Sequence, residues 1–131
     1  MKLRLSILAL LFVAISCNES DDSSSQQCQI TAPDRIFAIR EHEEEETIVG
    51  EVDATAEDDS LLSYSIESGN QDNVFALDPS NGRITVNNSQ DLDFEKIRQF
   101  VLEVKVSSLS CRSAMVSITI NVVDIDDTIN G

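Results

Sequence analysis

The chain has 131 residues, with 24 aspartates and glutamates against 9 lysines and arginines, and a formal net charge of −15. This length predicts one domain, and the acidity argues against binding to nucleic acid or electrostatic docking on an anionic membrane, because phosphate groups would be repelled. Hydrophobic residues make up 41% of the chain, which excludes a wholly disordered acidic protein, and aromatic residues, at 5%, are too few for a carbohydrate-stacking platform.

The first residues have the pattern of an export signal. Lys2 and Arg4 precede the apolar run 5–15, which is too short to cross a bilayer as a helix, since about 20 residues are needed. The run leads into the sequence AISC, which ends at Cys17 and resembles the lipobox of bacterial lipoproteins. By that resemblance, residues 1–16 are a cleaved signal peptide and Cys17 is the lipidated first residue of a protein held in the cell envelope. The alternative is an ordinary signal peptide with a cysteine at this position by chance.

Residues 17–27 are predicted to form a flexible tether, because the segment is polar, acidic and rich in serine. The acidic segment 19–22 resembles the signal that sends some Bacteroidetes lipoproteins to the outer face of the outer membrane. On this resemblance we expect a lipid-anchored protein exposed at the surface of the outer membrane. The alternative is a simple solvated linker.

Three cysteines, Cys17, Cys28 and Cys111, are an odd number for an exported chain. Lipidation of Cys17 would leave an even pair in an oxidising compartment. If Cys28 and Cys111 form a disulfide, they close most of the remaining chain into one loop, which the chain-entropy model values at about 4 kcal/mol. The alternative is two free thiols, which would be prone to oxidation outside the cytoplasm.

From Cys28 onward the hydrophobic period is two, which predicts strands with one buried face. Turn signals such as the Asn-Gly pair at 81–82 fall between these strands. Seven strands are expected, at 29–40, 47–55, 61–67, 73–77, 83–87, 99–107 and 114–123. The pattern favours an all-β fold, a seven-stranded antiparallel Greek-key sandwich forming a single domain over 28–131.

A series of short motifs runs through these predicted strands and turns. In chain order they are IREH at 39–42, VDA at 52–54, LSYSI at 62–66, SGN at 68–70, FALD at 75–78, NGRI at 81–84, LDFE at 92–95 and VDIDDT at 123–128. They are similar to V-x-E-N, V-x-A, L-x-Y-S-I, S-G-N, F-x-I-D, T-G-x-I, L-D-x-E and V-x-D-x-N-D-N of the cadherin repeat, in the form found in bacterial extracellular proteins. Each motif alone is weak, but the ordered series resembles the family strongly from about residue 30 to residue 128.

The resemblance implies a calcium site, because in that family the carboxylates of three motifs converge on one pole and hold calcium. Carried over by position, the ligands are Glu41, Asp93, Glu95, Asp124, Asp126 and Asp127. Calcium takes six to eight oxygen ligands, which carboxylates far apart in sequence can supply. Gathered without a cation, the same carboxylates would repel one another, so calcium would stiffen this pole.

The motifs depart from the family at four positions. Asp126 and Thr128 each replace an asparagine, while Ala56 and Ser108 stand where the family has aspartates that complete the calcium site of a preceding repeat. Because the sequence holds one repeat, we expect half of the usual ligands to be missing. Calcium binding should then be no tighter than the ~10⁻⁴–10⁻³ M of extracellular modules unless another chain completes the site.

In the family fold the chain enters at one pole and leaves at the other. The resemblance therefore implies that the pole of Glu41 points away from the membrane, with Cys28 and Cys111 close enough for a disulfide near the entry pole. The glutamates at 43–46 are either additional cation ligands or, the interpretation we favour, a solvated connection between strands.

The resemblance implies a surface-anchored lipoprotein with one cadherin-like repeat, acting in calcium-linked cell adhesion or in protein–protein interaction with another protein or a like chain. The alternative is a metal-free accessory domain of an outer-membrane polysaccharide-uptake or secretion complex. We predict no enzymatic activity, because the single histidine, His42, lies in an acidic stretch and forms no set with a serine or cysteine nucleophile. The spacing of histidine and cysteine also predicts no zinc site.

Overall fold

The alternating residues form β-strands in the computed structural model, which describes residues 27–125. Nine strands and one short 3-10 turn follow in chain order: β1 (Ile30–Thr31), β2 (Arg35–Arg40), β3 (Ile48–Glu51), β4 (Thr55–Ala56), β5 (Ser63–Ser68), η3 (Gln71–Asn73), β6 (Phe75–Leu77), β7 (Arg83–Val86), β8 (Gln99–Ser107) and β9 (Ala114–Val123). The predicted signal peptide, Cys17 and the tether up to residue 26 lie outside the described residues. In the described part, no helix is long and apolar enough to span a membrane.

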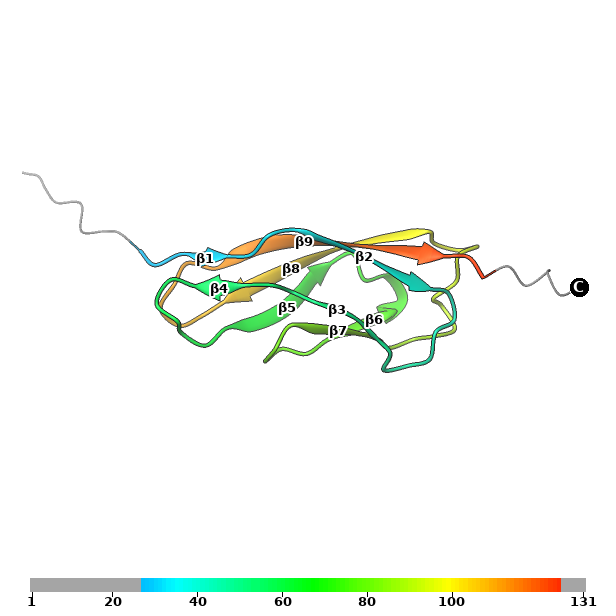
Figure 1. Ribbon diagram of the computed structural model, residues 1–131, viewed down its shortest axis with the longest axis horizontal. Helices are drawn as coiled ribbons and strands as arrows, with labels where there is room; N and C mark the ends of the chain where they lie inside the picture. Colours follow the sequence, from blue (N-terminus) through cyan, green and yellow to red (C-terminus); the bar gives the residue numbers. More distant parts are fainter. Residues whose placement is uncertain (1–26, 126–131) are drawn as a thin grey trace, which may run out of the picture.

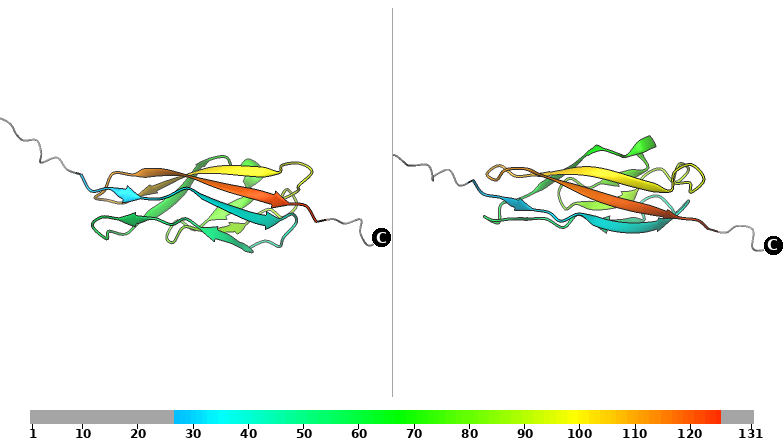
Figure 2. Two further views of the ribbon diagram at one scale, coloured as in Figure 1. Left: turned by 45° about the horizontal axis from the view of Figure 1, so that its top comes forward. Right: turned by 90° about the horizontal axis from the view of Figure 1, so that it is seen from above.

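Two larger sheets face each other across a hydrophobic core (Figures 1 and 2). One sheet has the strand order β2-β9-β8-β5, the other β3-β7-β6, and a small third sheet pairs β1 with β4. Along β8 and β9 every second residue is buried, as their alternation predicts, and Leu102 and Ile118 are fully buried. The rings of Phe75 and Phe100 meet edge to face, with their centroids 4.9 Å apart, and so connect the two sheets across the core.

The expected count of seven strands is wrong, because two of the predicted ranges each contain two strands. The range 29–40 divides at Pro33, which lacks a backbone N–H and stands between β1 and β2. Within the range 47–55, β3 pairs with β7, whereas β4 pairs with β1. The strand therefore breaks where its partner changes. In both cases the strand changes its neighbour, which a hydrophobic pattern does not reveal.

The expectation of a purely antiparallel sandwich is also wrong at one place. β2 runs parallel to β9, from the pair Arg35 and Ile118 to the pair Arg40 and Val123. A parallel pair needs a long connection, and here almost the whole domain lies between the two strands. Because β2 and β9 run in the same direction, the residues that follow both strands emerge at the same end of the molecule.

The two ends of the sandwich are formed by different segments, and the described chain enters at one end and leaves at the other (Figures 1 and 2). We call residues 27–31, 55–60 and 108–113 the N-terminal pole. We call residues 41–47, 87–98 and 124–125 the C-terminal pole. The second pole gathers the chain after β2, the connection between β7 and β8, and the chain after β9.

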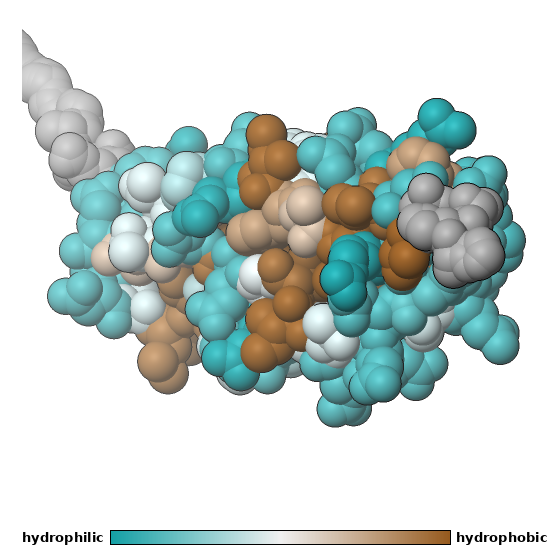
Figure 3. Space-filling view, turned by 45° about the vertical axis from the view of Figure 1, so that its right-hand side comes forward, coloured by the Kyte–Doolittle hydropathy of each residue, from teal (hydrophilic) through white to brown (hydrophobic). Residues whose placement is uncertain are grey.

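Several large apolar side chains remain on the surface. Figure 3 shows hydrophobic side chains reaching the surface on the side turned toward the C-terminal pole. On the outer face of the four-stranded sheet, the register puts Ile36, Thr119 and Val101 side by side on β2, β9 and β8. The exposed fraction is 71% for Ile36 and 42% for Val101. Ile36 and Val101, with Thr119 between them, therefore form a small apolar contact surface within this face.

Candidate functional site

Glu41 occupies the centre of the C-terminal pole, immediately after β2 ends at Arg40. Its side chain is the one buried charged group of the described residues, with 7% exposure. One carboxylate oxygen accepts the backbone N–H of Phe94 (3.1 Å) and the other accepts that of Ile125 (3.0 Å). Glu41 thereby ties three separate segments of the chain together at this pole.

The hydrogen bonds of Glu41 also favour its charged form. The backbone amides of Ile125 and Phe94 lower the pKa of the Glu41 carboxyl, against the raising effect of burial. A side-chain hydrogen bond with Asp124 and the nearby His42 lower this pKa further. Two carboxyl groups at hydrogen-bond distance share a proton or a cation, because two bare carboxylates repel each other. A cation at this contact would relieve the repulsion between Glu41 and Asp124.

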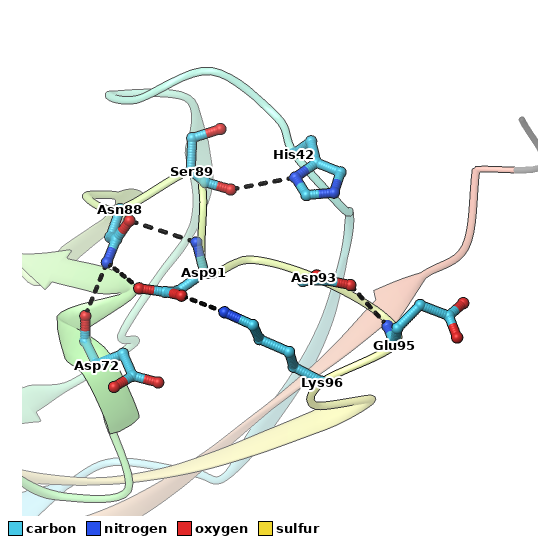
Figure 4. Close-up of polar contacts among 8 residues, drawn as sticks. All are labelled: His42, Asp72, Asn88, Ser89, Asp91, Asp93, Glu95 and Lys96. Carbon is cyan, nitrogen blue, oxygen red and sulfur yellow. Dashed lines mark hydrogen bonds and ion pairs between the residues drawn. The ribbon is translucent and has the colours of Figure 1, made fainter.

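Asp93 lies in the connection between β7 and β8, directly after the fully buried Leu92, which anchors that loop in the core. One oxygen of Asp93 accepts the backbone N–H of Glu95 (2.8 Å), which forms a tight local turn. Within that turn the Glu95 side chain is exposed, and Figure 4 shows its carboxylate pointing away from Asp93 and His42. The structure thus brings Asp93 to Glu41 but turns Glu95 outward.

His42 lies beside the two carboxylates. A ligand atom from each of Glu41, His42 and Asp93 lies within 4.8 Å of the other two. The imidazole Nε2 is 3.5 Å from a Glu41 oxygen, and Nδ1 is 3.4 Å from the Ser89 carbonyl oxygen. The His42 side chain is 52% exposed, and its acidic neighbours in the sequence gave no sign that the ring lies beside Glu41 and Asp93.

A second polar network holds the same loop in place (Figure 4). Lys96 donates to Asp91, whose other oxygen accepts the Asn88 amide at 2.7 Å. The amide of Asn88 also donates to the Asp72 carbonyl, which connects the loop to η3. The hydrogen bond from Lys96 lowers the pKa of Asp91, and the pKa of Lys96 rises in return. Lys96 therefore adds a positive charge near the carboxylates of the pole.

The residues of this pole fit calcium in kind, since Glu41, Asp93 and Asp124 are hard oxygen donors. They come from three segments that β2, β9 and the β7–β8 connection bring to one end. Bound through one oxygen each, these three carboxylates of the described residues would supply three of the six to eight oxygens that calcium takes. Asp126 and Asp127, the other two expected ligands, lie outside the described residues.

The N-terminal pole also contains a group of potential metal ligands, formed by Cys28, Asp58 and Cys111. Here Cys28 and Cys111 are joined in a disulfide, with their Cα atoms 4.5 Å apart, so neither sulfur is available as a thiolate ligand. The Asp58 carboxylate accepts the Ser110 hydroxyl (2.6 Å) and the Ser60 backbone N–H (3.0 Å). This pole is closed by a covalent bond and by neutral hydrogen-bond donors.

Sequence comparison matches this chain to cadherin domains and cadherin-related proteins. The sequence profile described as Cadherin domain matches residues 35–123. The Fat-like cadherin-related tumor suppressor homolog of Drosophila melanogaster is 35% identical over 75 residues, which cover 57% of this chain and 2% of that protein. Cadherin-87A of the same species is 29% identical over 120 residues, which cover 86% of this chain and 6% of that protein. The chain thus spans a small fraction of the curated relatives it matches.

Solved structures have the same fold. A crystal structure of Drosophila N-cadherin EC1-3 superposes with a TM-score of 0.66 at 22% identity, over 76% of this chain and 35% of that one. The protocadherin gammaB7 EC3-6 cis-dimer structure superposes with a TM-score of 0.65 at 25% identity, over 76% of this chain and 24% of that one. The likeness covers most of the described sandwich.

Proposed function

The chain belongs to the cadherin domain family, and on this premise we propose that it is a cell-surface module for calcium-linked adhesion or protein–protein interaction. The observation that carries the proposal is the position of Glu41 within the matched range. Its buried carboxylate meets Asp93 and Asp124 at the end of the sandwich where the described chain leaves. Membership in a family of adhesion modules and the gathered oxygen donors both support a calcium-linked role in adhesion.

In this proposal calcium binds at the C-terminal pole through Glu41, Asp93 and Asp124, with Asp126 and Asp127 as further ligands. The contacts of Glu41 with Phe94 and Ile125 support a coupling between the cation and the loops around it. A cation there would lower the repulsion among the carboxylates and stabilise the folded chain by mass action. Glu95 is a ligand in this proposal only if its side chain turns back toward Asp93.

We further propose that the chain is anchored through a lipid on Cys17 in the cell envelope, at the surface of an outer membrane. The described chain starts at the N-terminal pole and leaves at the opposite end (Figure 1), where Glu41 and Asp93 come together. An anchor that precedes the N-terminal pole would leave the C-terminal pole directed away from the lipid. The calcium site would then face the medium and other cells.

The proposed partner is another protein or a second copy of this chain. Support comes from the apolar surface formed by Ile36, Thr119 and Val101 on the outer face of the four-stranded sheet. Exposed apolar side chains on a sheet are suited to a protein contact. The structure of protocadherin gammaB7 is described as a cis-dimer, which is a property of that protein and an analogy for this one.

A calcium titration of the full-length chain tests the cation part of the proposal. We expect heat of binding and a higher melting temperature at ~10 mM calcium, a concentration above the usual range of extracellular modules. Asp93→Asn should remove the effect, while Glu44→Gln, which removes one negative charge from the exposed run at 43–46, should retain it. Calcium that produces neither heat nor a shift in melting temperature would exclude a calcium site.

A bead-aggregation assay tests the adhesion part. Beads coated with the full-length chain should aggregate more in calcium than in chelator if the partner is a second copy. Ile36→Asp on the apolar surface should reduce aggregation without lowering the melting temperature, because the side chain is exposed. If beads stay dispersed and no protein is captured in a calcium-dependent manner, an adhesive role is wrong.

A further inference from the structure

The C-terminal pole contains one group that a calcium site does not require, the imidazole ring of His42. This residue has φ of 58°, in the left-handed region that few residues other than glycine and asparagine adopt. Its backbone N–H donates to the Leu92 carbonyl at 2.8 Å. The backbone thereby holds the ring beside the loop that carries Asp93.

The His42 ring has a defined orientation beside the loop that carries Asp93 (Figure 4). Nδ1 lies 3.4 Å from the Ser89 carbonyl oxygen, which can only accept, so Nδ1 carries the hydrogen in this contact. Nε2 faces Glu41, 3.5 Å from one of its oxygens, and offers a lone pair to a cation when the ring is neutral. Histidines that bind metals commonly make the same arrangement, with one ring N–H on a backbone carbonyl and the other nitrogen on the metal.

The three side chains together form a mixed donor set. Glu41 and Asp93 each offer a carboxylate oxygen and His42 offers a nitrogen, all within 4.8 Å of one another. Calcium selects oxygen ligands, whereas imidazole nitrogen suits zinc and neighbouring transition metals. Zinc binds through three protein ligands plus a further position that a water or a fourth side chain fills. The Asp124 carboxyl, which hydrogen-bonds to Glu41, is a further oxygen donor beside this set.

We propose that the C-terminal pole binds zinc, or a divalent cation of the same class, through Glu41, His42 Nε2 and Asp93. The inference shares Glu41 and Asp93 with the proposed calcium site but rests on His42, which the calcium proposal does not use. Because the two cations would compete for the same carboxylates, zinc should weaken the effect of calcium on the chain. Zinc would then act as an antagonist of the calcium-bound form.

The test compares zinc titrations of the full-length chain and its variants by calorimetry. Every sample carries Cys17→Ser, since a free thiol would bind zinc itself, and no sample contains a polyhistidine tag. His42→Asn is the main variant, because asparagine tolerates the left-handed backbone and keeps the fold. Glu44→Gln is the matched control, which removes a nearby charge from an exposed position.

We expect micromolar zinc binding by the parent chain and by Glu44→Gln. His42→Asn should weaken zinc binding by at least tenfold, because losing even a hydrogen-bond partner of a metal ligand costs about 10–100-fold, and should leave calcium binding within twofold. His42 is the only histidine of the chain, so its single pair of imidazole proton signals in an NMR spectrum should shift or broaden at one equivalent of zinc. Asp93→Asn should weaken the binding of both cations.

The inference would be overturned by no zinc binding in the parent chain, or by equal zinc affinity in the parent and His42→Asn. An imidazole signal that is unchanged by zinc would do the same. If calcium has no effect but zinc binds and shifts the His42 signal, the inference holds and the proposed calcium function fails. The two proposals are therefore separated by the same set of samples.

Discussion

The two poles of this sandwich hold their chain segments together in different ways. At the N-terminal pole, the Cys28–Cys111 disulfide joins the start of the domain to the β8–β9 connection, and Asp58 receives hydrogen bonds from Ser110 and Ser60. At the C-terminal pole, a buried carboxylate holds three segments together through backbone amides. The first pole is closed by a covalent bond, and the second depends on charge.

This difference determines which pole can respond to its surroundings. A disulfide and neutral donors leave the N-terminal pole without a need for a cation. The C-terminal pole gathers Glu41, Asp93 and Asp124, whose negative charges favour a bound cation over mutual repulsion. We therefore expect divalent cations to stabilise the C-terminal pole and to have no effect on the N-terminal pole.

Removal of the disulfide should have the largest effect on stability. Cys28→Ser with Cys111→Ser opens a loop of 83 positions, which the chain-entropy model values at about 4 kcal/mol in the free energy of unfolding. Urea denaturation of the full-length chain measures this loss. The calcium response should survive in the double variant, and its disappearance would show that the two poles are not independent.

Glu41→Gln should have the next largest effect, at the opposite pole. A glutamine has one carbonyl oxygen, so the amide of Phe94 or that of Ile125 loses its acceptor. We expect the melting temperature to fall by roughly 5 °C and the shift caused by calcium to vanish. Thermal melting with calcium and with chelator measures both, and Glu44→Gln should behave as the parent. A normal calcium shift in Glu41→Gln would remove Glu41 from the site.

Substitution of Asp58 should have a smaller effect on stability, and this effect should depend on pH. The Ser110 hydroxyl, followed by the hydroxyl and N–H of Ser60, lowers the pKa of Asp58 from its ordinary value of 3.8. A lowered folded-state pKa stabilises the fold above the unfolded-state value, and this contribution is lost as the pH falls through the folded-state value. The stability difference between the parent and Asp58→Asn should therefore be constant above about pH 5 and shrink below 3.8. A difference that grows in acid would contradict this contact.

Lys96→Gln should have the smallest effect. Its ion pair with Asp91 is partly solvent-exposed, and pairs near the surface contribute little to stability. Lys96 also acts electrostatically on Asp93, so loss of its positive charge should raise calcium affinity by about twofold. Calorimetric titration at low ionic strength measures this change. Weaker calcium binding would mean that Lys96 matters through the position of the loop and not through its charge.

The sequence by itself determined the all-β class and most of the strand positions. Along 99–107 and 114–123 the alternation predicts the buried face residue by residue, because successive side chains of a strand point to opposite sides. Short motifs were also sufficient to identify the family, which the profile match over 35–123 confirms. The prediction of a disulfide between Cys28 and Cys111 agrees with the structure, although the cysteine count alone left free thiols open.

Only the tertiary structure decided how the strands pair and which side chains meet. The breaks at Pro33 and between β3 and β4 arise because the chain changes partner, and the parallel pairing of β2 with β9 depends on residues more than 80 positions apart. The outward turn of Glu95 and the position of the half-exposed His42 ring beside Glu41 depend on the local turn at Asp93 and on a left-handed backbone. Composition and spacing describe neighbours along the chain, whereas a cation site is formed by neighbours in space.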